Sequence, residues 1–190
     1  MIYIFMANGM EEIEALQTAD ILRRAELEVQ LAAVGGTGPD KLLVTGAHGI
    51  KIVCDITEEE ADPAVTQMIV LPGGIPGALN LGKSQVVQGF ADLAAANGIW
   101  IGAICAAPVI LGQKGLLEGR RATCFPGYQD QLVGAVHTGS PLEVDGKIIT
   151  ARSMGCAIPF GLRLVEALCG RPRAELLRDS LFCPPGLEAF

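Results

Sequence analysis

The chain has 190 residues, of which 50% are hydrophobic and 18% charged, and its formal net charge is −7. This length fits one domain with a full hydrophobic core, and the acidic balance, without a basic run, argues against a nucleic-acid partner. The mean hydropathy of +0.40 is high, yet the longest uncharged run, 93–113, is interrupted by Asn97-Gly98, Gly102 and Pro108. These interruptions argue against a transmembrane helix and a membrane partner.

The N-terminus and the cysteines bear on the compartment. Residues 1–6 form an apolar run without a basic leader, so we expect neither secretion nor organelle import, and a cytoplasmic location. The six cysteines are scattered and form no CxxC motif, which favours reduced thiols over disulfides. Neither His48 nor His137 is spaced from a cysteine as zinc ligands are, so we expect no metal.

Apolar runs and turn signals predict elements in the following order along the chain. Short apolar runs predict strands at 3–6, 28–34, 68–71, 99–104 and 120–124. Helical patterns predict helices at 11–24, 84–96, 157–168 and 173–181, with a brief helix over 57–60. Residues 35–41 resemble a loop, 44–55 a hairpin or edge strand turning at 46–49, and 184–190 a short tail. Asp145-Gly146 predicts a hairpin between 142–144 and 147–151.

Strands that alternate with helices predict a single α/β domain with a mainly parallel sheet. In the first long helix, Ile13, Leu16, Ile21 and Leu22 mark a mostly buried face. Ligands of such domains bind at the carboxyl ends of the strands.

Cys105 is the strongest candidate for chemistry. It follows a strand-like run and precedes Ala106-Ala107-Pro108 and a helical stretch, a pattern that places it on a sharp strand-to-helix turn. Such a turn holds a nucleophile strained and exposed at the mouth of the sheet, and the helix start favours a thiolate. From the run alone, the alternative is a small buried core residue. Core positions are the expectation for Cys54, Cys124, Cys156 and Cys169.

Two further features reach the same edge of the predicted sheet. Glu14 lies on the helix after the first strand, and Gly73-Gly74 ends a central strand. A thiol needs an acid or base partner for covalent chemistry, and Glu14 near a strand mouth would be partly desolvated, which raises its pKa. Gly73, Gly74 and Ala106 can supply N–H donors for an oxyanion. Glu11 and Glu12 are interpreted as solvated.

Together the segments GMEEIEAL, IVLPGGIPGALNL and IGAICAAPVIL resemble the ThiJ/PfpI superfamily, in the ThiJ/YajL-like branch that includes the Parkinson-associated protein deglycase. The resemblance covers about 1–170 and implies one such domain over 1–183. It also implies a flavodoxin-like three-layer sandwich with a mainly parallel central sheet, similar to class I glutamine amidotransferases, and a homodimer. By resemblance, Cys105 is the nucleophile, Glu14 its hydrogen-bonded carboxyl group, and Gly74 and Ala106 oxyanion donors.

The chain departs from the family at two informative positions. Some members carry a histidine where this chain has Phe125, which we retain as a pocket residue. In the peptidase-like branch a histidine follows the nucleophile, where this chain has Ala106, which argues against a Cys-His triad. His48 follows a turn region, where a loop-tip residue and a pocket residue, including one across a dimer interface, are equally good interpretations.

The resemblance leads to two functional hypotheses. The first is a cofactor-free glyoxalase III or protein deglycase acting on small reactive carbonyls such as methylglyoxal and glyoxal in stress protection. In it, the Cys105 thiolate adds to the aldehyde and Glu14 shuttles a proton. The alternative is a redox-sensing cysteine protein or oxidative-stress chaperone without significant turnover.

Overall fold

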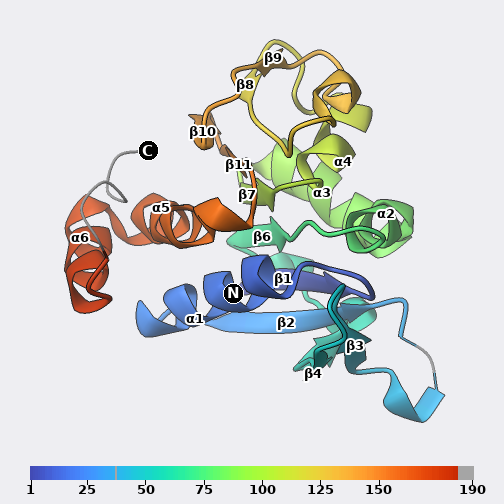
Figure 1. Cartoon of the computed structure of the whole chain (residues 1–190). Helices are drawn as coiled ribbons and strands as arrows, with labels where there is room; N and C mark the ends of the chain where they lie inside the picture. The colour runs from blue at the N-terminus through green and yellow to red at the C-terminus, as the bar shows by residue number, and fades with distance from the viewer. Residues whose placement is uncertain (37, 184–190) are drawn as a thin grey trace.

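The computed structural model describes residues 1–36 and 38–183 of the chain (Figure 1). The central sheet contains seven strands. They are β1 (Ile2–Ala7), β2 (Val29–Val34), β5 (Ile56–Thr57), β6 (Met68–Leu71), β7 (Trp100–Ile104), β10 (Leu142–Asp145) and β11 (Ile148–Ala151). Their order is β10-β11-β7-β6-β1-β2-β5, and only β10 runs antiparallel to its neighbour. The predicted α/β class with a mainly parallel sheet is therefore confirmed.

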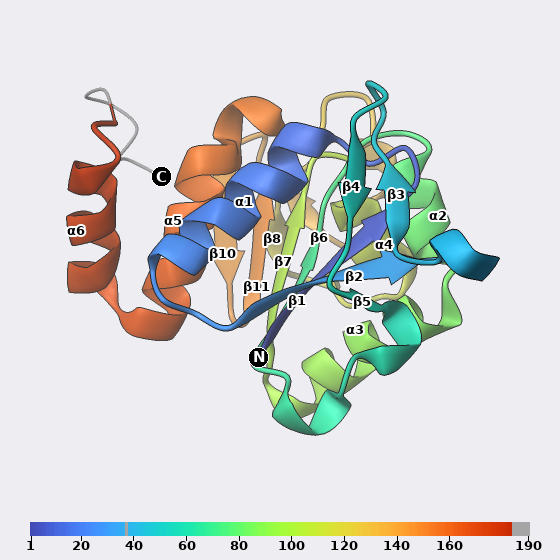
Figure 2. The ribbon, with the colours of Figure 1, turned by 90° about the horizontal axis from the view of Figure 1, so that it is seen from below.

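Helices cover both faces of this sheet (Figures 1 and 2). The helices on one side are α1 (Glu12–Arg24) and α5 (Ala157–Cys169), with α6 (Arg171–Ser180) packed on α5. Those on the other side are α2 (Gly77–Lys83), α3 (Gln85–Asn97) and α4 (Pro108–Gln113). The result is the expected three-layer sandwich.

Each face of the sheet has its own hydrophobic core, and β1 contributes to both. Ile2, Ile4 and Met6 belong to the cluster that includes Phe160, whereas Tyr3, Phe5 and Ala7 belong to the opposite cluster. Because side chains alternate along a strand, a strand covered on both faces is apolar at every position. The uninterrupted apolar run at the N-terminus of the chain reflects this two-sided burial.

The observed boundaries differ from the predicted ones mainly outside the central sheet. Residues 44–55 form a hairpin of β3 (Leu43–Thr45) and β4 (Lys51–Val53) that pairs only with itself. The strand predicted at 120–124 is short, since β8 (Arg121–Ala122) pairs with β9 (Val136–His137) outside the main sheet. The reason is that the Thr123 N–H donates to the Thr150 hydroxyl instead of to a strand backbone.

Helix α2 is not among the predicted helices, because a segment that contains glycines is more typical of a loop. Gly77 is needed for contact rather than for a turn, since a Cβ there would lie 2.4 Å from the Met10 backbone. The brief helix expected over 57–60 is a single 3-10 turn, Glu58–Glu60, closed by a capping box from Thr57.

The buried face of α1 is rotated from the predicted one. Ile13 is 46% exposed, whereas the neighbouring Glu14 is 1% exposed. The face that packs on the sheet contains Glu14, Ala15, Thr18, Ile21 and Leu22, a helical spacing of residues one, four, seven and eight apart from Glu14. Apolar periodicity alone placed Ile13 inside, because it gives no weight to a buried carboxyl group.

No helix within 1–36 and 38–183 is both long enough and apolar enough to cross a membrane. The tail predicted at 184–190 lies outside the described residues.

The core on the α1–α5 side of the sheet predicts that two phenylalanine truncations lower the free energy of unfolding by different amounts. Phe160 is fully buried against the sheet, whereas Phe182 is 92% exposed. We expect Phe160→Ala to lower the free energy of unfolding by about 3–5 kcal/mol, through lost burial and a residual cavity. Phe182→Ala should change it by less than about 0.5 kcal/mol. Urea denaturation measures both values, and equal costs would contradict this description of the core.

Candidate functional site

Cys105 occupies the turn between β7 and α4 at the carboxyl edge of the sheet. Its φ of +65° is in the left-handed region, which costs energy for a residue with a side chain. Two hydrogen bonds hold the strained backbone: Cys105 N–H donates to Ala151 C=O at 2.8 Å, and Phe125 N–H donates to Cys105 C=O at 2.8 Å. The predicted strand-to-helix turn is therefore present, and Cys105 is partly exposed.

Glu14 reaches the same point from α1. One carboxylate oxygen, Oε2, accepts a hydrogen bond from Gly73 N–H at 2.8 Å, and the carboxyl group is also hydrogen-bonded to Cys105. The other oxygen, Oε1, is buried without a hydrogen-bond partner. An unpaired buried acceptor is costly, so this oxygen is available to hold or move a proton.

The two glycines after β6, Gly73 and Gly74, make different contacts in the site. A Cβ at Gly73 would lie 2.5 Å from the Cys105 Cβ and 2.7 Å from Glu14 Oε2, so only glycine leaves room for this carboxyl–thiol pair. Gly73 N–H donates to Glu14 in this structure, and its predicted role as an oxyanion donor stays a prediction. Gly74, with a φ of +83°, instead turns its N–H toward the Cys105 sulfur, as does Ala106.

The electrostatics of the pair differ from the sequence expectation. Burial raises the pKa of Glu14 to about 7, and the negative charge of Glu11 adds to this rise. Burial, followed by the Glu14 charge, raises the pKa of the Cys105 thiol to about 12, against the lowering effect of the Gly74 and Ala106 N–H groups. The helix start alone therefore does not produce a thiolate. When Glu14 takes up a proton, its charge no longer opposes ionisation of the sulfur.

The predicted pocket residue Phe125 touches Cys105 through its backbone. Its ring is 42% exposed and lies 6.3 Å from the ring of Tyr128 in an edge arrangement. An aromatic ring cannot carry a proton as a histidine could, so this segment supplies shape rather than acid–base chemistry. No described contact links His137, on β9, to Cys105.

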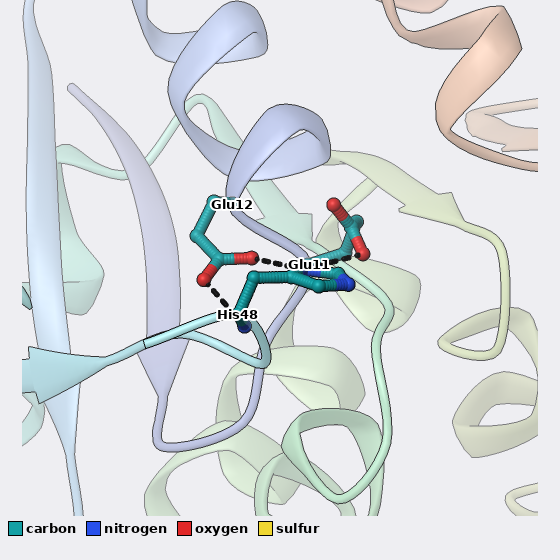
Figure 3. Close-up of side chains that lie close together, drawn as sticks. All are labelled: Glu11, Glu12 and His48. Atoms are coloured by element: carbon teal, nitrogen blue, oxygen red, sulfur yellow. Dashed lines mark hydrogen bonds and ion pairs between the residues drawn. The ribbon is translucent and has the colours of Figure 1, made fainter. Parts of the chain in front are cut away.

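His48 is bound to two glutamates rather than to the thiol (Figure 3). Its Nδ1 lies 2.9 Å from Glu12 Oε2 and 3.6 Å from Glu11 Oε2. Glu12 Oε1 also accepts hydrogen bonds from the backbone N–H groups of His48 and Ile50, at 2.7 and 3.4 Å. Glu12 thereby attaches the β3–β4 turn to the start of α1. The interpretation of Glu11 and Glu12 as solvated is wrong, since Glu12 is 3% exposed.

This triplet has its own charge balance. Although burial raises the pKa of Glu12, hydrogen bonds from the His48 ring and from backbone N–H groups outweigh it and leave that pKa below its usual value. The hydrogen bond to Glu12 and then the charge of Glu11 raise the pKa of His48. The donor atoms of Glu11, Glu12 and His48 all lie within 4.8 Å of one another. This grouping is not predicted from the spacing of histidines and cysteines, because the partners of His48 are glutamates 36 and 37 positions earlier in the chain.

Cys54, Cys124, Cys156 and Cys169 form no disulfide. Cys54, Cys124 and Cys156 are buried as expected, but Cys169 is exposed, because it is the last residue of α5. Cys124 immediately precedes Phe125, yet its thiol is directed to the Phe125 carbonyl at 3.4 Å. Cys105 differs from Cys54, Cys124 and Cys156 in sharing a hydrogen bond with a carboxyl group, that of Glu14.

Comparison with known proteins places this geometry in a family context. The DJ-1/PfpI family model matches residues 1–167. The chain is 36% identical over 186 residues to Protein DJ-1 homolog B of Arabidopsis thaliana, covering 97% of this chain and 42% of that protein. It therefore spans less than half the length of that relative. It is 32% identical to the glutathione-independent glyoxalase DJR-1.2 of Caenorhabditis elegans, covering 90% of this chain and 89% of that protein.

The solved structures agree. Oxidized DJ-1 of Toxoplasma gondii is 32% identical to this chain and superposes with a TM-score of 0.86. The match covers 95% of this chain and 97% of the T. gondii chain. The family match extends over most of the chain and includes Glu14, Gly73, Gly74 and Cys105. The chain therefore belongs to the DJ-1/PfpI family.

Proposed function

We propose that the protein is a cofactor-free glyoxalase that converts methylglyoxal or glyoxal into the corresponding hydroxy acid in defence against reactive carbonyls. The observation that carries this proposal is the Glu14 carboxyl group, which is held by Gly73, hydrogen-bonded to Cys105, and left with one unpaired oxygen. A thiol and one proton carrier are enough for an internal proton transfer, which needs no metal or electron acceptor. The glyoxalase name of the C. elegans relative supports the same chemistry.

In the proposed reaction, the substrate is held as a covalent adduct of Cys105 until water releases the product. The Cys105 sulfur adds to the aldehyde carbon of methylglyoxal, and the resulting oxyanion takes a proton to give a hemithioacetal. Gly74 and Ala106, whose N–H groups face the sulfur, stabilise that oxyanion. Glu14 removes the proton from the former aldehyde carbon and returns one to the adjacent carbon through an enediol, which leaves a lactoyl thioester. Water cleaves the thioester, and lactate and the free thiol are released.

The same addition on sugar-like adducts of protein side chains would produce deglycase activity.

We also propose a homodimer. Its support is the exposure of three apolar residues on α1 and the β3–β4 hairpin: Ile13, Ile50 and Val53 are 46%, 53% and 71% exposed. Ile50 N–H donates to Glu12, the neighbour of Ile13, so the hairpin turn is attached to the start of α1, and exposed apolar side chains of this kind are typical of protein–protein contacts.

A redox function is the second candidate. The same N–H groups and carboxyl group that face Cys105 could hold the oxygens of a sulfinate. The solved T. gondii relative is described as oxidized. In this case the protein would act on a partner or a client protein, without significant catalytic turnover.

Lactate release tests the enzymatic proposal. We expect Cys105→Ser and Glu14→Gln each to lower kcat for methylglyoxal by at least about 100-fold, because each removes one of the two reacting groups. Cys169→Ser, at an exposed cysteine, is the matched control and should keep wild-type activity. D- and L-lactate are measured separately. Equal rates in wild type and both site variants would refute the proposal.

The protonation of Glu14 is tested by stability. Its pKa is raised from 4.5 to about 7 in the folded protein, so the folded state binds the extra proton and loses stability as pH rises through this range. Between about pH 5 and about pH 8, wild type should lose roughly 2–3 kcal/mol relative to Glu14→Gln. Urea unfolding at both pH values measures this, with the exposed Glu26→Gln as control. A pH-independent difference would mean that Glu14 has an ordinary pKa.

Mild peroxide distinguishes the redox candidate. Each oxygen added to the Cys105 sulfur comes from one peroxide molecule, which is reduced to water. If the redox function holds, intact mass should increase by two oxygens at Cys105, while Cys169, although exposed, should remain unmodified at the same dose. Glu14→Gln should change the yield. Oxidation of both cysteines to the same extent would show ordinary thiol exposure and would exclude a specialised sensor.

A further inference from the structure

A second polar cavity lies at the carboxyl ends of β1 and β2, where ligands of parallel α/β sheets bind. We call it the edge pocket; its volume is about 320 Å³. Its polar lining consists of Asn8, Gly35, Glu58, Asn80, Lys83 and Ser84. These residues come from the ends of β1 and β2, from the 3-10 turn before β6, and from α2 and its junction with α3. None of them contributes to the Cys105 site.

The edge pocket is built around a buried carboxylate. Glu58 is only 6% exposed, and its Oε1 accepts a hydrogen bond from Gly35 N–H at 2.8 Å. Its Oε2 accepts the hydroxyl hydrogen of Ser84, which also caps the N-terminus of α3. A carboxylate offers about four acceptor positions, so Glu58 can still accept hydrogen bonds from a bound molecule.

The two asparagines are oriented by their own backbone contacts. Asn8 Oδ1 accepts from Thr45 N–H at 2.8 Å, and Asn80 Nδ2 donates to the Asn8 carbonyl at 2.9 Å. These bonds determine which end of each side-chain amide is left for a ligand. Asn8 keeps its NH₂ group as a donor, and Asn80 keeps its side-chain carbonyl as an acceptor. The lining of the edge pocket therefore includes one residue with a spare amide donor, Asn8, and one with a spare amide acceptor, Asn80.

Lys83 supplies the positive charge. It is exposed at the C-terminus of α2, and within the described ranges its ammonium group is in no ion pair with an acidic residue. An occupant must therefore present an anionic group to Lys83 and hydroxyl donors to Glu58 and Asn80. A purely apolar ligand would leave these groups unpaired.

We propose that the edge pocket binds a small hydroxylated anion, either a sugar-alcohol phosphate or a hydroxy carboxylate. The cavity volume is at the lower end of the range for small-molecule sites, which suits a molecule of this size. The lining is nearly all polar, with Val34 as the apolar exception. Recognition then depends on matched donors and acceptors.

Calorimetric titration tests the proposal with three probes that lack a carbonyl and so cannot react with Cys105: sorbitol 6-phosphate, gluconate and uncharged sorbitol. At least one of the two anions should bind, and sorbitol should bind at least tenfold more weakly, because it lacks the partner for Lys83. Comparing the two anions shows whether phosphate or carboxylate is the preferred group. Inorganic phosphate is titrated in parallel and should also bind at least tenfold more weakly.

Variants locate the binding. Lys83→Met should weaken the preferred anion at least tenfold, and Asn80→Ala should weaken it further, whereas Lys51→Met, at an exposed lysine on β4, should leave it unchanged. Circular dichroism establishes that each variant is folded. Cys105→Ser should bind like wild type, so this result does not depend on the proposed activity. Absence of binding by both anions, equal binding by Lys83→Met, or equal binding of inorganic phosphate would overturn the proposal.

Discussion

The hydrogen bond from Gly73 N–H to the Glu14 carboxylate is the interaction on which the candidate site depends. It joins α1 to the loop after β6 at 2.8 Å, and it holds a carboxyl group that is 1% exposed. Without a donor, such a burial would be prohibitively costly. With one donor and a thiol neighbour, the burial is tolerated, and its remaining cost appears as the raised pKa of Glu14.

This constraint explains several local features that have no other evident purpose. Gly73 is excluded from carrying a side chain because a Cβ would contact both Cys105 and Glu14. Cys105 accepts a left-handed backbone conformation, since that turn brings its sulfur to the carboxyl group. Strain and desolvation are thus concentrated at one edge of the sheet, while the two hydrophobic cores on its faces supply the stability that tolerates them.

Charge around the site is organised in two shells. Glu14 is in contact with the thiol, and Glu11, one helical turn earlier, raises its pKa through space. His48 is exposed yet held by Glu11 and Glu12 (Figure 3), so its ring lies beside the Glu11 carboxylate. The β3–β4 hairpin, whose turn carries His48, is therefore connected to the electrostatics of the site through Glu11, although it contributes no strand to the central sheet.

The sequence determined the layered α/β fold, because two-sided burial and helix–strand alternation are local patterns that apolar runs record directly. It also located Cys105, since a strand run ending in a cysteine before Ala-Ala-Pro is a local signal, and the family resemblance indicated Glu14. Only the tertiary structure decided which face of α1 is buried, that Gly73 N–H donates to Glu14, and that Glu12 binds His48. Those outcomes depend on contacts between residues 36 to 59 positions apart, and no local periodicity contains them.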